Sequence, residues 1–247
     1  MFKFNYEPNE LANKVILVTG AGDGIGKQAA ITYAKLGATV ILLGKTTKKL
    51  EDVYDLIIEQ NSAQPAIIPL DLKGTSKQNY IDMVTTIKEQ FGKLDGALLN
   101  AAMLGELSPF SQIHEQIWTD VMQVNVTSQY LLSQALLPLL QNTKNASLVF
   151  TSSGVGNKGK AYWGAYSVSK FAIEGMMQVI ADEYEKTMLH TNAIRPGATE
   201  TKMRSVAYPG ENKQNIAKPI DIMPAYIYLM SDKSSHVNGQ IIDAQTA

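Results

Sequence analysis

Apolar runs and stretches of helical periodicity alternate along this chain. The runs are short, rich in Val, Ile and Leu, and bounded by turn residues, which is typical of buried strands. They predict strands in 14–19, 39–44, 66–72, 94–100, 146–153, 189–196 and 239–244. Apolar residues at helical spacing predict helices in 25–38, 47–60, 77–91, 115–140, 165–187 and 221–230. Strands apolar on both faces and separated by helices indicate an α/β fold, a single doubly wound, Rossmann-like parallel sheet of about seven strands with helices on both faces.

One segment breaks this alternation. Residues 197–219 are polar and rich in turn residues, and a loop of this length inside a compact domain is usually functional. We therefore predict a substrate lid there. Residues 1–13 precede the first strand and are assigned to an N-terminal extension. Residues 14–247 are assigned to a single domain, because no change in composition marks a second one.

Composition excludes several classes of function. A charged fraction of 18% and a net charge of -1 provide no basic surface for nucleic acid or anionic lipid. The chain has no cysteine, and its three histidines, at 114, 190 and 236, are too far apart in sequence to suggest a metal site. We find no apolar run with the pattern of a signal peptide or a membrane span. We therefore expect a cytoplasmic protein with a small-molecule ligand, and no metal, nucleic acid or membrane partner.

A glycine-rich turn follows the first predicted strand. Residues 19–26 have the sequence TGAGDGIG and lead directly into a predicted helix. Glycines let the backbone approach a pyrophosphate closely, and the amide groups at the start of a helix favour an anion. Glycines alone could equally form a simple turn, and their spacing differs from G-x-G-x-x-G. The strand–turn–helix context nevertheless favours a dinucleotide site.

Further motifs follow in order along the chain. They are LNAAM after the fourth predicted strand, MQVNVTS in a helix, TSSGVG after the fifth strand, YSVSK in the next helix and RPGATET after the sixth strand. Together with the T-G-x-x-x-G-x-G turn, this set resembles the motifs of the short-chain dehydrogenase/reductase family, and the chain is most similar to the YciK-type bacterial oxidoreductases of that family. The resemblance implies an NAD(P)-dependent oxidoreductase that transfers a hydride between a nicotinamide cofactor and a carbonyl or secondary alcohol.

The resemblance also assigns the cofactor contacts by position. Two departures from the family pattern are Ala102, where a glycine is usual, and the C-terminal IIDAQTA, which replaces V-D-G-G. The extra methyl group of Ala102 would narrow the nicotinamide pocket. The residues expected to contact the cofactor are Gly20, Asp23, Gly24, Ile25, Gly26, Gly44, Lys45, Asp71, Leu72, Asn100, Ala101, Ala102, Tyr166, Lys170, Pro196, Gly197, Thr199 and Thr201.

The end of the second predicted strand indicates which dinucleotide binds. An acidic residue there would accept the ribose 2′-OH of NAD, but this chain has Gly44, followed by Lys45 and Thr46. A cation and a hydroxyl suit a 2′-phosphate, so we predict a preference for NADP(H), with NAD(H) as the alternative. Against this, Lys45 could be a solvated loop lysine, and Asp23 lies where NADP-dependent relatives often carry a basic residue.

Tyr166 and Lys170 lie four residues apart in a predicted helix and therefore on one face of it. Helical spacing alone could produce such a pair by chance, but the resemblance implies a catalytic set of Asn125, Ser153, Tyr166 and Lys170. Tyr166 would be the proton donor or acceptor, and we expect the Lys170 charge to lower its pKa. Ser153, preferred over Ser152 by the family spacing, would bind the substrate oxygen. Asn125 would hold a water through its backbone or be a structural helix residue.

The substrate contacts are predicted from their position relative to these motifs. The residues expected there are Ser153, Trp163, Tyr166, Met103 and Leu104. Mostly apolar walls favour an uncharged or partly hydrophobic carbonyl or alcohol as the substrate. Lys202 and Arg204 in the lid keep an acidic substrate as the alternative. Because family members commonly pair the helices corresponding to 115–140 and 165–187, the resemblance implies a homodimer or homotetramer. The competing hypothesis is a non-catalytic NADP(H)-binding redox sensor, and the complete Asn/Ser/Tyr/Lys set argues against it.

Overall fold

The computed structural model describes residues 1–60 and 62–245, and a parallel sheet of seven strands forms its centre. The strands are β1 (Val15–Thr19), β2 (Thr39–Gly44), β3 (Ala66–Pro69), β4 (Gly96–Leu99), β5 (Ala146–Thr151), β6 (Leu189–Arg195) and β7 (Ile241–Asp243). Their order is β3-β2-β1-β4-β5-β6-β7, so successive strands are added on one side of β1 up to β3 and on its other side from β4 onwards. Such a switch point leaves a crevice at the carboxyl ends of β1 and β4. The predicted fold is confirmed. Positions 246 and 247 of the predicted domain lie outside the described residues.

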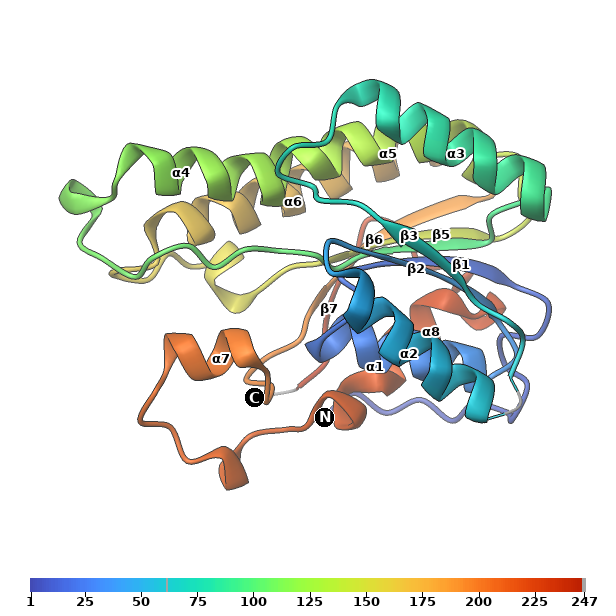
Figure 1. The fold of residues 1–247 in the computed structure, drawn as a ribbon, viewed down its shortest axis with the longest axis horizontal. Helices are drawn as coiled ribbons and strands as arrows, with labels where there is room; N and C mark the ends of the chain where they lie inside the picture. The colour runs from blue at the N-terminus through green and yellow to red at the C-terminus, as the bar shows by residue number, and fades with distance from the viewer. Residues whose placement is uncertain (61, 246–247) are drawn as a thin grey trace.

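Helices cover both faces of the sheet (Figure 1). On one face lie α1 (Gly24–Lys35), α2 (Thr47–Glu59) and α8 (Met223–Met230), and on the other lie α3 (Lys77–Phe91), α5 (Ser128–Leu140) and α6 (Gly164–Glu183). Each strand therefore contributes to two hydrophobic cores. In β1, Ile16 and Val18 pack into the first core and Leu17 into the second. Burial on both faces explains why the strands are continuous apolar runs. Among the described residues, no helix is long and apolar enough to cross a membrane.

The first 13 residues lie against the rest of the protein. The amide of Phe2 donates to the carbonyl of Ala244 at 2.9 Å. The rings of Phe2 and Phe4 lie 5.5 and 5.1 Å from the ring of Tyr228 in α8, measured between centroids. Leu11 is fully buried in the core on the α1 and α8 face. The predicted N-terminal extension therefore contributes apolar side chains to that core.

The helix predicted over 115–140 is interrupted in the structure. A π-helical turn, Gln123–Thr127, joins α4 (Glu115–Met122) to α5. Such turns carry one extra residue and occur frequently at functional sites. Asn125 is in the middle of the turn, and its side chain bonds to the main chain of Met103, which is far away in sequence. Apolar periodicity does not reveal an insertion that involves a distant segment.

The predicted lid contains secondary structure of its own. It includes a short helix, α7 (Lys202–Ala207), and a bridge between Thr199 and Ala217 closes its base. After β7, the side-chain amide of Gln245 donates to the carbonyl of Pro196 at 2.8 Å. The part of the IIDAQTA end that the structure describes therefore fixes the beginning of the lid. The sequence predicted neither the helix within residues 197–219 nor this contact.

Candidate active site

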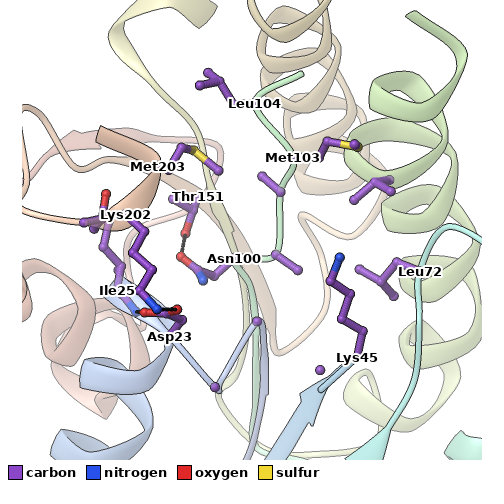
Figure 2. A pocket seen from close by; sticks show the side chains of 18 of the residues that line it. Asp23, Ile25, Lys45, Leu72, Asn100, Met103, Leu104, Thr151, Lys202 and Met203 are labelled. Carbon is purple, nitrogen blue, oxygen red and sulfur yellow. Dashed lines mark hydrogen bonds and ion pairs between the residues drawn. The ribbon is translucent and has the colours of Figure 1, made fainter. Parts of the chain in front are cut away.

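A cavity of about 610 Å³ opens at the carboxyl ends of the strands, beside β1 and β4, between which the strand order reverses (Figure 2). Ligands bind at this position in open parallel sheets. The predicted residues that line it are Gly20, Asp23, Gly24, Ile25, Gly44, Lys45, Asp71, Leu72, Asn100, Ala101, Ala102, Met103, Leu104, Ser153, Trp163, Tyr166, Lys170, Pro196, Gly197, Thr199 and Thr201. Gly26 and Asn125, also predicted, are not part of the cavity wall.

The turn between β1 and α1 exposes bare backbone to the cavity. Gly20 and Gly24 have φ angles of 67° and 53°, in the left-handed region that favours glycine. Gly26 acts from behind, because a Cβ there would lie 2.3 Å from the carbonyl oxygen of Gly20. Asp23 caps α1 by accepting from the amide of Gly24 at 2.9 Å. The following amides of the first helical turn have no partner within the helix and are available to an anion.

Polar contacts tie together the strand ends beneath the cavity. The hydroxyl of Thr19, the last residue of β1, accepts from the amides of Asn100 and Ala101 at 2.9 Å each. The Asn100 carboxamide accepts in turn from the hydroxyl of Thr151 at the end of β5, at 3.2 Å (Figure 2). These bonds position the segment that continues through Ala102 along the cavity wall.

The end of β2 presents a cation to the cavity. Lys45 is exposed, and in Figure 2 its ammonium points into the cavity on the same side as Leu72. Thr46 and Asp71 line the same part of the wall. Since Gly44 occupies the place of the usual acidic residue, a cation and a hydroxyl remain to meet a group on the adenosine ribose. This arrangement suits a phosphate better than a free hydroxyl.

Asp23 lies against two lysines (Figure 2 shows one of them). Its carboxylate is 2.6 Å from Lys49 Nζ in α2 and 3.4 Å from Lys202 Nζ in α7. Partial burial by itself raises the pKa of Asp23, but the hydrogen bonds from Lys49 and the Gly24 amide hold that pKa below its ordinary value. The negative charge is therefore compensated within the protein. Lys49 was not predicted; the available signal was its place in the first turn of the helix that follows Lys45.

Tyr166 and Lys170 project from the beginning of α6 toward the cavity. Both are nearly fully buried, with 8% and 3% of their surface exposed. The ammonium of Lys170 lies 5.5 Å from the centre of the Tyr166 ring and donates to the carbonyl of Thr151 at 2.7 Å. The structure thus brings the two predicted side chains together in the cavity wall, with the lysine anchored to the end of β5.

Desolvation dominates the acid–base properties of this pair. Burial raises the pKa of Tyr166 to about 12, although a hydrogen bond with Ser153 lowers that pKa in part. Burial also lowers the pKa of Lys170 to about 8, although the negative charge of Glu174 raises that pKa in part. The direction predicted for the tyrosine from the lysine charge was wrong, because the cost of burying a phenolate outweighs that charge. At neutral pH the phenol is therefore protonated, as a proton donor requires.

The two serines after β5 have different roles. The hydroxyl of Ser152 donates to Glu174 at 2.6 Å, and Glu174 accepts two further hydrogen bonds from Arg195 at 2.8 and 2.7 Å. Ser153 is extended, lies in the cavity wall and bonds to Tyr166. Successive residues of an extended segment point to opposite sides. Of the two serines, Ser153 is therefore the one whose side chain lies beside the tyrosine.

Asn125 is buried behind the cavity. Its carboxamide accepts from the amide of Met103 at 2.7 Å and donates to the carbonyl of the same residue at 2.9 Å. It also donates to the hydroxyl of Ser169 in α6 at 3.0 Å. The side chain therefore joins the π-helical turn to the segment after β4 and to the helix of Tyr166. The side chain of Asn125 therefore has the structural role that was one of its two interpretations.

The far wall of the cavity is mostly apolar. Met103, Leu104 and Trp163 line it, as predicted from their positions. The lid adds residues that the sequence did not assign, Met203 and Ala207, because the lid was not expected to form a helix. Figure 2 shows Met103, Leu104 and Met203 around the opening above Asn100. This region can accommodate an apolar group next to Tyr166.

Comparison with known proteins adds three findings. The short chain dehydrogenase family model matches residues 14–212. The uncharacterized oxidoreductase YciK of Escherichia coli (strain K12) is 50% identical over 243 residues, which cover 98% of this chain and 96% of that protein. Crystal structures of short chain dehydrogenases from Shigella flexneri, complexed with NADP, and from Escherichia coli CFT073, complexed with NADPH, each superpose with a TM-score of 0.95 at 49% identity. Each covers 97% of this chain and 100% of the other. These findings agree with the resemblance inferred from the motifs.

Proposed function

This chain belongs to the short-chain dehydrogenase family, and we propose that it reduces a carbonyl compound to the corresponding alcohol with NADPH. The balanced reaction converts the carbonyl compound, NADPH and a proton into the alcohol and NADP⁺, a reaction of class EC 1.1.1. The observation that carries the proposal is the convergence of a buried, protonated Tyr166 and the hydroxyl of Ser153 on one cavity. The same cavity begins at a glycine turn of the dinucleotide-binding type.

The residues present fit an NADP(H) molecule. Gly20 and Gly24 line the cavity in left-handed conformations and present bare backbone that a pyrophosphate can approach closely. We assign the pyrophosphate to this turn, the adenine to Asp71 and Leu72, and the 2′-phosphate to Lys45 and Thr46. The nicotinamide end is assigned to Asn100, Ala101, Ala102, Pro196, Gly197, Thr199 and Thr201, and its ribose to Tyr166 and Lys170. Relatives 49% identical to this chain bind NADP and NADPH in their crystals, which supports the assignment. The bound cofactor supplies the hydride.

The protein's own groups act on the substrate oxygen. Ser153 donates a hydrogen bond to it, and Tyr166 transfers its proton to that oxygen as negative charge develops there. Lys170, with its ammonium 5.5 Å from the ring centre, stabilises the phenolate that remains. In the relay that the family resemblance implies, the backbone of Asn125 holds a water between Lys170 and solvent, and this water returns the proton.

The test is NADPH oxidation, followed by absorbance, over a panel of ketones, aldehydes and quinones, with NADPH binding measured in parallel by fluorescence. We expect turnover of at least one compound, and a higher kcat/KM with NADPH than with NADH. Tight NADPH binding without any turnover would instead favour the redox sensor. A preference for NADH would contradict the cofactor assignment.

Lys45 provides a specific test of cofactor choice. We expect Lys45→Ala to raise the Kd for NADPH about tenfold, since a charged hydrogen bond to the 2′-phosphate is lost, and to leave the Kd for NADH unchanged. The matched control is Lys48→Ala, because Lys48 lies in the same region but pairs with Asp52 at 3.0 Å and does not line the cavity. An equal loss of NADPH and NADH affinity in Lys45→Ala would show that Lys45 does not contact the 2′-phosphate.

We also propose that the protein acts in the cytoplasm as a homodimer or homotetramer that pairs α5 and α6. In support, these helices carry the exposed apolar side chains Tyr130, Val168, Phe171 and Val179. Exposed apolar groups gathered on neighbouring helices are typical of protein interfaces. Light scattering of the purified protein tests the assembly, and cell fractionation tests the location. A monomer, with Val179→Glu behaving identically to wild type, would contradict this pairing.

A further inference from the structure

Two cations of the lid, Lys202 and Arg204, line the cavity, and Arg204 lies beside its apolar wall. It lies in α7, next to Met203 and near Ala207, which line the same cavity. An arginine in a substrate pocket usually binds a carboxylate or a phosphate of the ligand, because the guanidinium presents two parallel N–H groups. The sequence left open whether this residue selects an acidic substrate.

The structure shows that Arg204 already holds a carboxylate of the chain itself. Its Nε and one Nη donate to the two oxygens of Glu211, the first at 2.7 Å. Its guanidinium also stacks on the ring of Tyr208, with Cζ 3.8 Å from the ring centre. Only 24% of the Arg204 side chain and 25% of the Glu211 side chain are exposed. The hydrogen bond from Arg204 holds the pKa of Glu211 below its ordinary value, so the pair is ionised at neutral pH.

The other cations around this wall are also engaged. Lys202 turns toward Asp23 at the cofactor end, 3.4 Å away. Lys160 donates to the hydroxyl of Tyr208 at 2.7 Å and is not part of the cavity wall. Lys170 is buried at the base of the cavity, where its ammonium donates to Thr151. An anionic group entering between Trp163 and the lid would therefore meet an Arg204 whose charge Glu211 already neutralises.

We propose that this site takes an uncharged carbonyl compound with an apolar body, and that Glu211 enforces the preference by neutralising Arg204. The inference rests on the proposed function, because it concerns the substrate of that same site. The apolar body would lie among Met103, Leu104, Trp163 and Met203, which line the cavity. Binding of a carboxylate-bearing analogue is disfavoured for two reasons. The carboxylate loses its hydration on entering the cavity, and the guanidinium of Arg204 is already paired with Glu211.

Two compounds that differ mainly in charge test the preference directly. Methyl 4-formylbenzoate is neutral and 4-formylbenzoate is anionic, while both carry the same aromatic aldehyde. Their Kd values are measured by calorimetry on the NADP⁺-loaded protein, which cannot reduce them. We expect the ester to bind at least about tenfold more tightly than the acid. Equal or tighter binding of the acid would overturn the proposal, as would failure of the ester to bind up to its solubility limit.

The role of Glu211 is tested by releasing Arg204. We expect Glu211→Gln to increase affinity for the acid about tenfold and to leave affinity for the ester unchanged. Glu106→Gln is the matched control, because it removes a carboxylate from the exposed surface near the cavity without touching Arg204. The double variant Glu211→Gln/Arg204→Met should return acid affinity to the wild-type value. No gain for the acid in Glu211→Gln, or an equal gain in Glu106→Gln, would contradict the assignment.

These binding measurements do not depend on turnover. If the ester binds preferentially and NADPH is never oxidised, the proposed reaction fails while the ligand preference stands. If NADPH is oxidised but the acid binds as well as the ester, the reaction stands and the ligand preference fails. The two proposals are therefore tested separately.

Discussion

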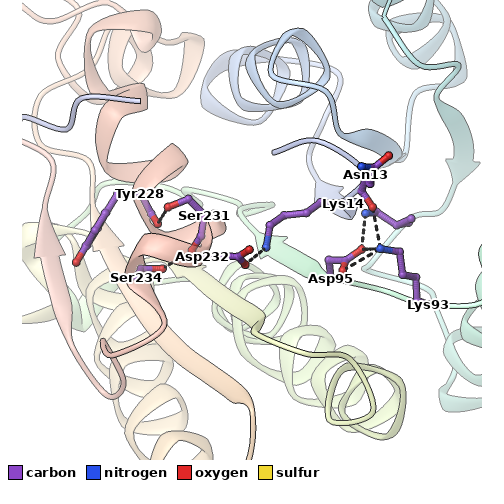
Figure 3. A network of polar contacts seen from close by, with 9 residues as sticks. Asn13, Lys14, Lys93, Asp95, Tyr228, Ser231, Asp232 and Ser234 are labelled. Carbon is purple, nitrogen blue, oxygen red and sulfur yellow. Dashed lines mark hydrogen bonds and ion pairs between the residues drawn. The ribbon is translucent and has the colours of Figure 1, made fainter. Parts of the chain in front are cut away.

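The two ends of the sheet treat buried charge differently. At the amino ends of β1 and β4 (Figure 3), Lys14 pairs with Asp232 at 2.7 Å and Lys93 with Asp95 at 2.9 Å. Asp95 also accepts from the amide of Val15 at 2.7 Å. These contacts join the strand ends to one another and to the segment after α8, so opposite charges of the chain satisfy each other there.

At the carboxyl ends, Tyr166 and Lys170 are at least as deeply buried as Lys14 and Asp95, but burial shifts the pKa of each in the direction that opposes charge. Lys170 donates to the main-chain carbonyl of Thr151. Lys14 at the amino ends instead forms an ion pair with a carboxylate. Burying polar groups without full compensation lowers stability, and it is typical of sites where a ligand completes the arrangement. We therefore infer that one end of the sheet serves stability and propose that the other serves chemistry.

Glu174 is the exception at the carboxyl end, and its removal should have the largest effect on stability. It holds Arg195 through two hydrogen bonds and Ser152 through a third. Breaking a buried ion pair leaves its partner uncompensated, so we expect Glu174→Gln to lower the free energy of unfolding by about 3 kcal/mol. Urea unfolding measures the loss. Glu183→Gln, at the exposed end of the same helix, is the matched control and should change little; equal losses in the two variants would contradict the distinction.

Removing the buried charge of Lys170 should abolish turnover but increase stability. Its pKa falls from 10.5 to about 8, which corresponds to a burial cost of about 3 kcal/mol at neutral pH. Losing the bond to the Thr151 carbonyl returns about 1 kcal/mol, so we expect Lys170→Met to raise the free energy of unfolding by about 2 kcal/mol.

The pH dependence of that gain provides an internal check. Below pH 8 the lysine is charged in both the folded and the unfolded chain, and the whole cost applies. Between pH 8 and 10.5 the unfolded chain binds more protons than the folded one, so the stability of the wild type rises with pH. The advantage of Lys170→Met should therefore shrink when unfolding is measured at pH 10 in place of pH 7. A less stable variant, or a constant advantage, would argue against a buried ammonium.

Lys14→Met breaks the ion pair at the opposite end, where the effect should be smaller and opposite in sign. Because 67% of the Asp232 side chain is exposed, water can replace much of the interaction. We expect the free energy of unfolding to fall by about 1 kcal/mol, while the Kd for NADPH stays at the wild-type value. Fluorescence titration and urea unfolding measure the two quantities. A change in NADPH affinity would show that the two ends are not independent.

The sequence predicted the strands, their order of appearance and most of the cavity wall. Parallel strands buried on both faces are long apolar runs, and functional residues cluster where such strands end. Gly26 and Asn125, predicted as cofactor and catalytic residues, lie behind the wall, as the contacts with Gly20 and Met103 show. Family motifs indicate which residues matter and not on which side of the wall they lie.

Other features depend on three-dimensional contacts that no local pattern records. The π-helical turn accompanies a bond between Asn125 and a distant segment, and the lid is held by Gln245 from beyond β7. The direction of the Tyr166 pKa shift was wrong because burial outweighs the neighbouring lysine. Glu211 became recognisable only through its partner, Arg204.

The central claim is that the phenol of Tyr166 supplies the proton for carbonyl reduction. The most direct test compares wild type with Tyr166→Phe, using the carbonyl compound that wild type reduces fastest with NADPH, and measures kcat together with the Kd for NADPH. Removing one hydroxyl preserves the ring and its contact with Trp163, whose centroid is 5.7 Å away. We expect kcat to fall about a thousandfold, while the Kd for NADPH rises no more than about tenfold through the lost hydrogen bond to the ribose. A variant that retains wild-type kcat would contradict the account.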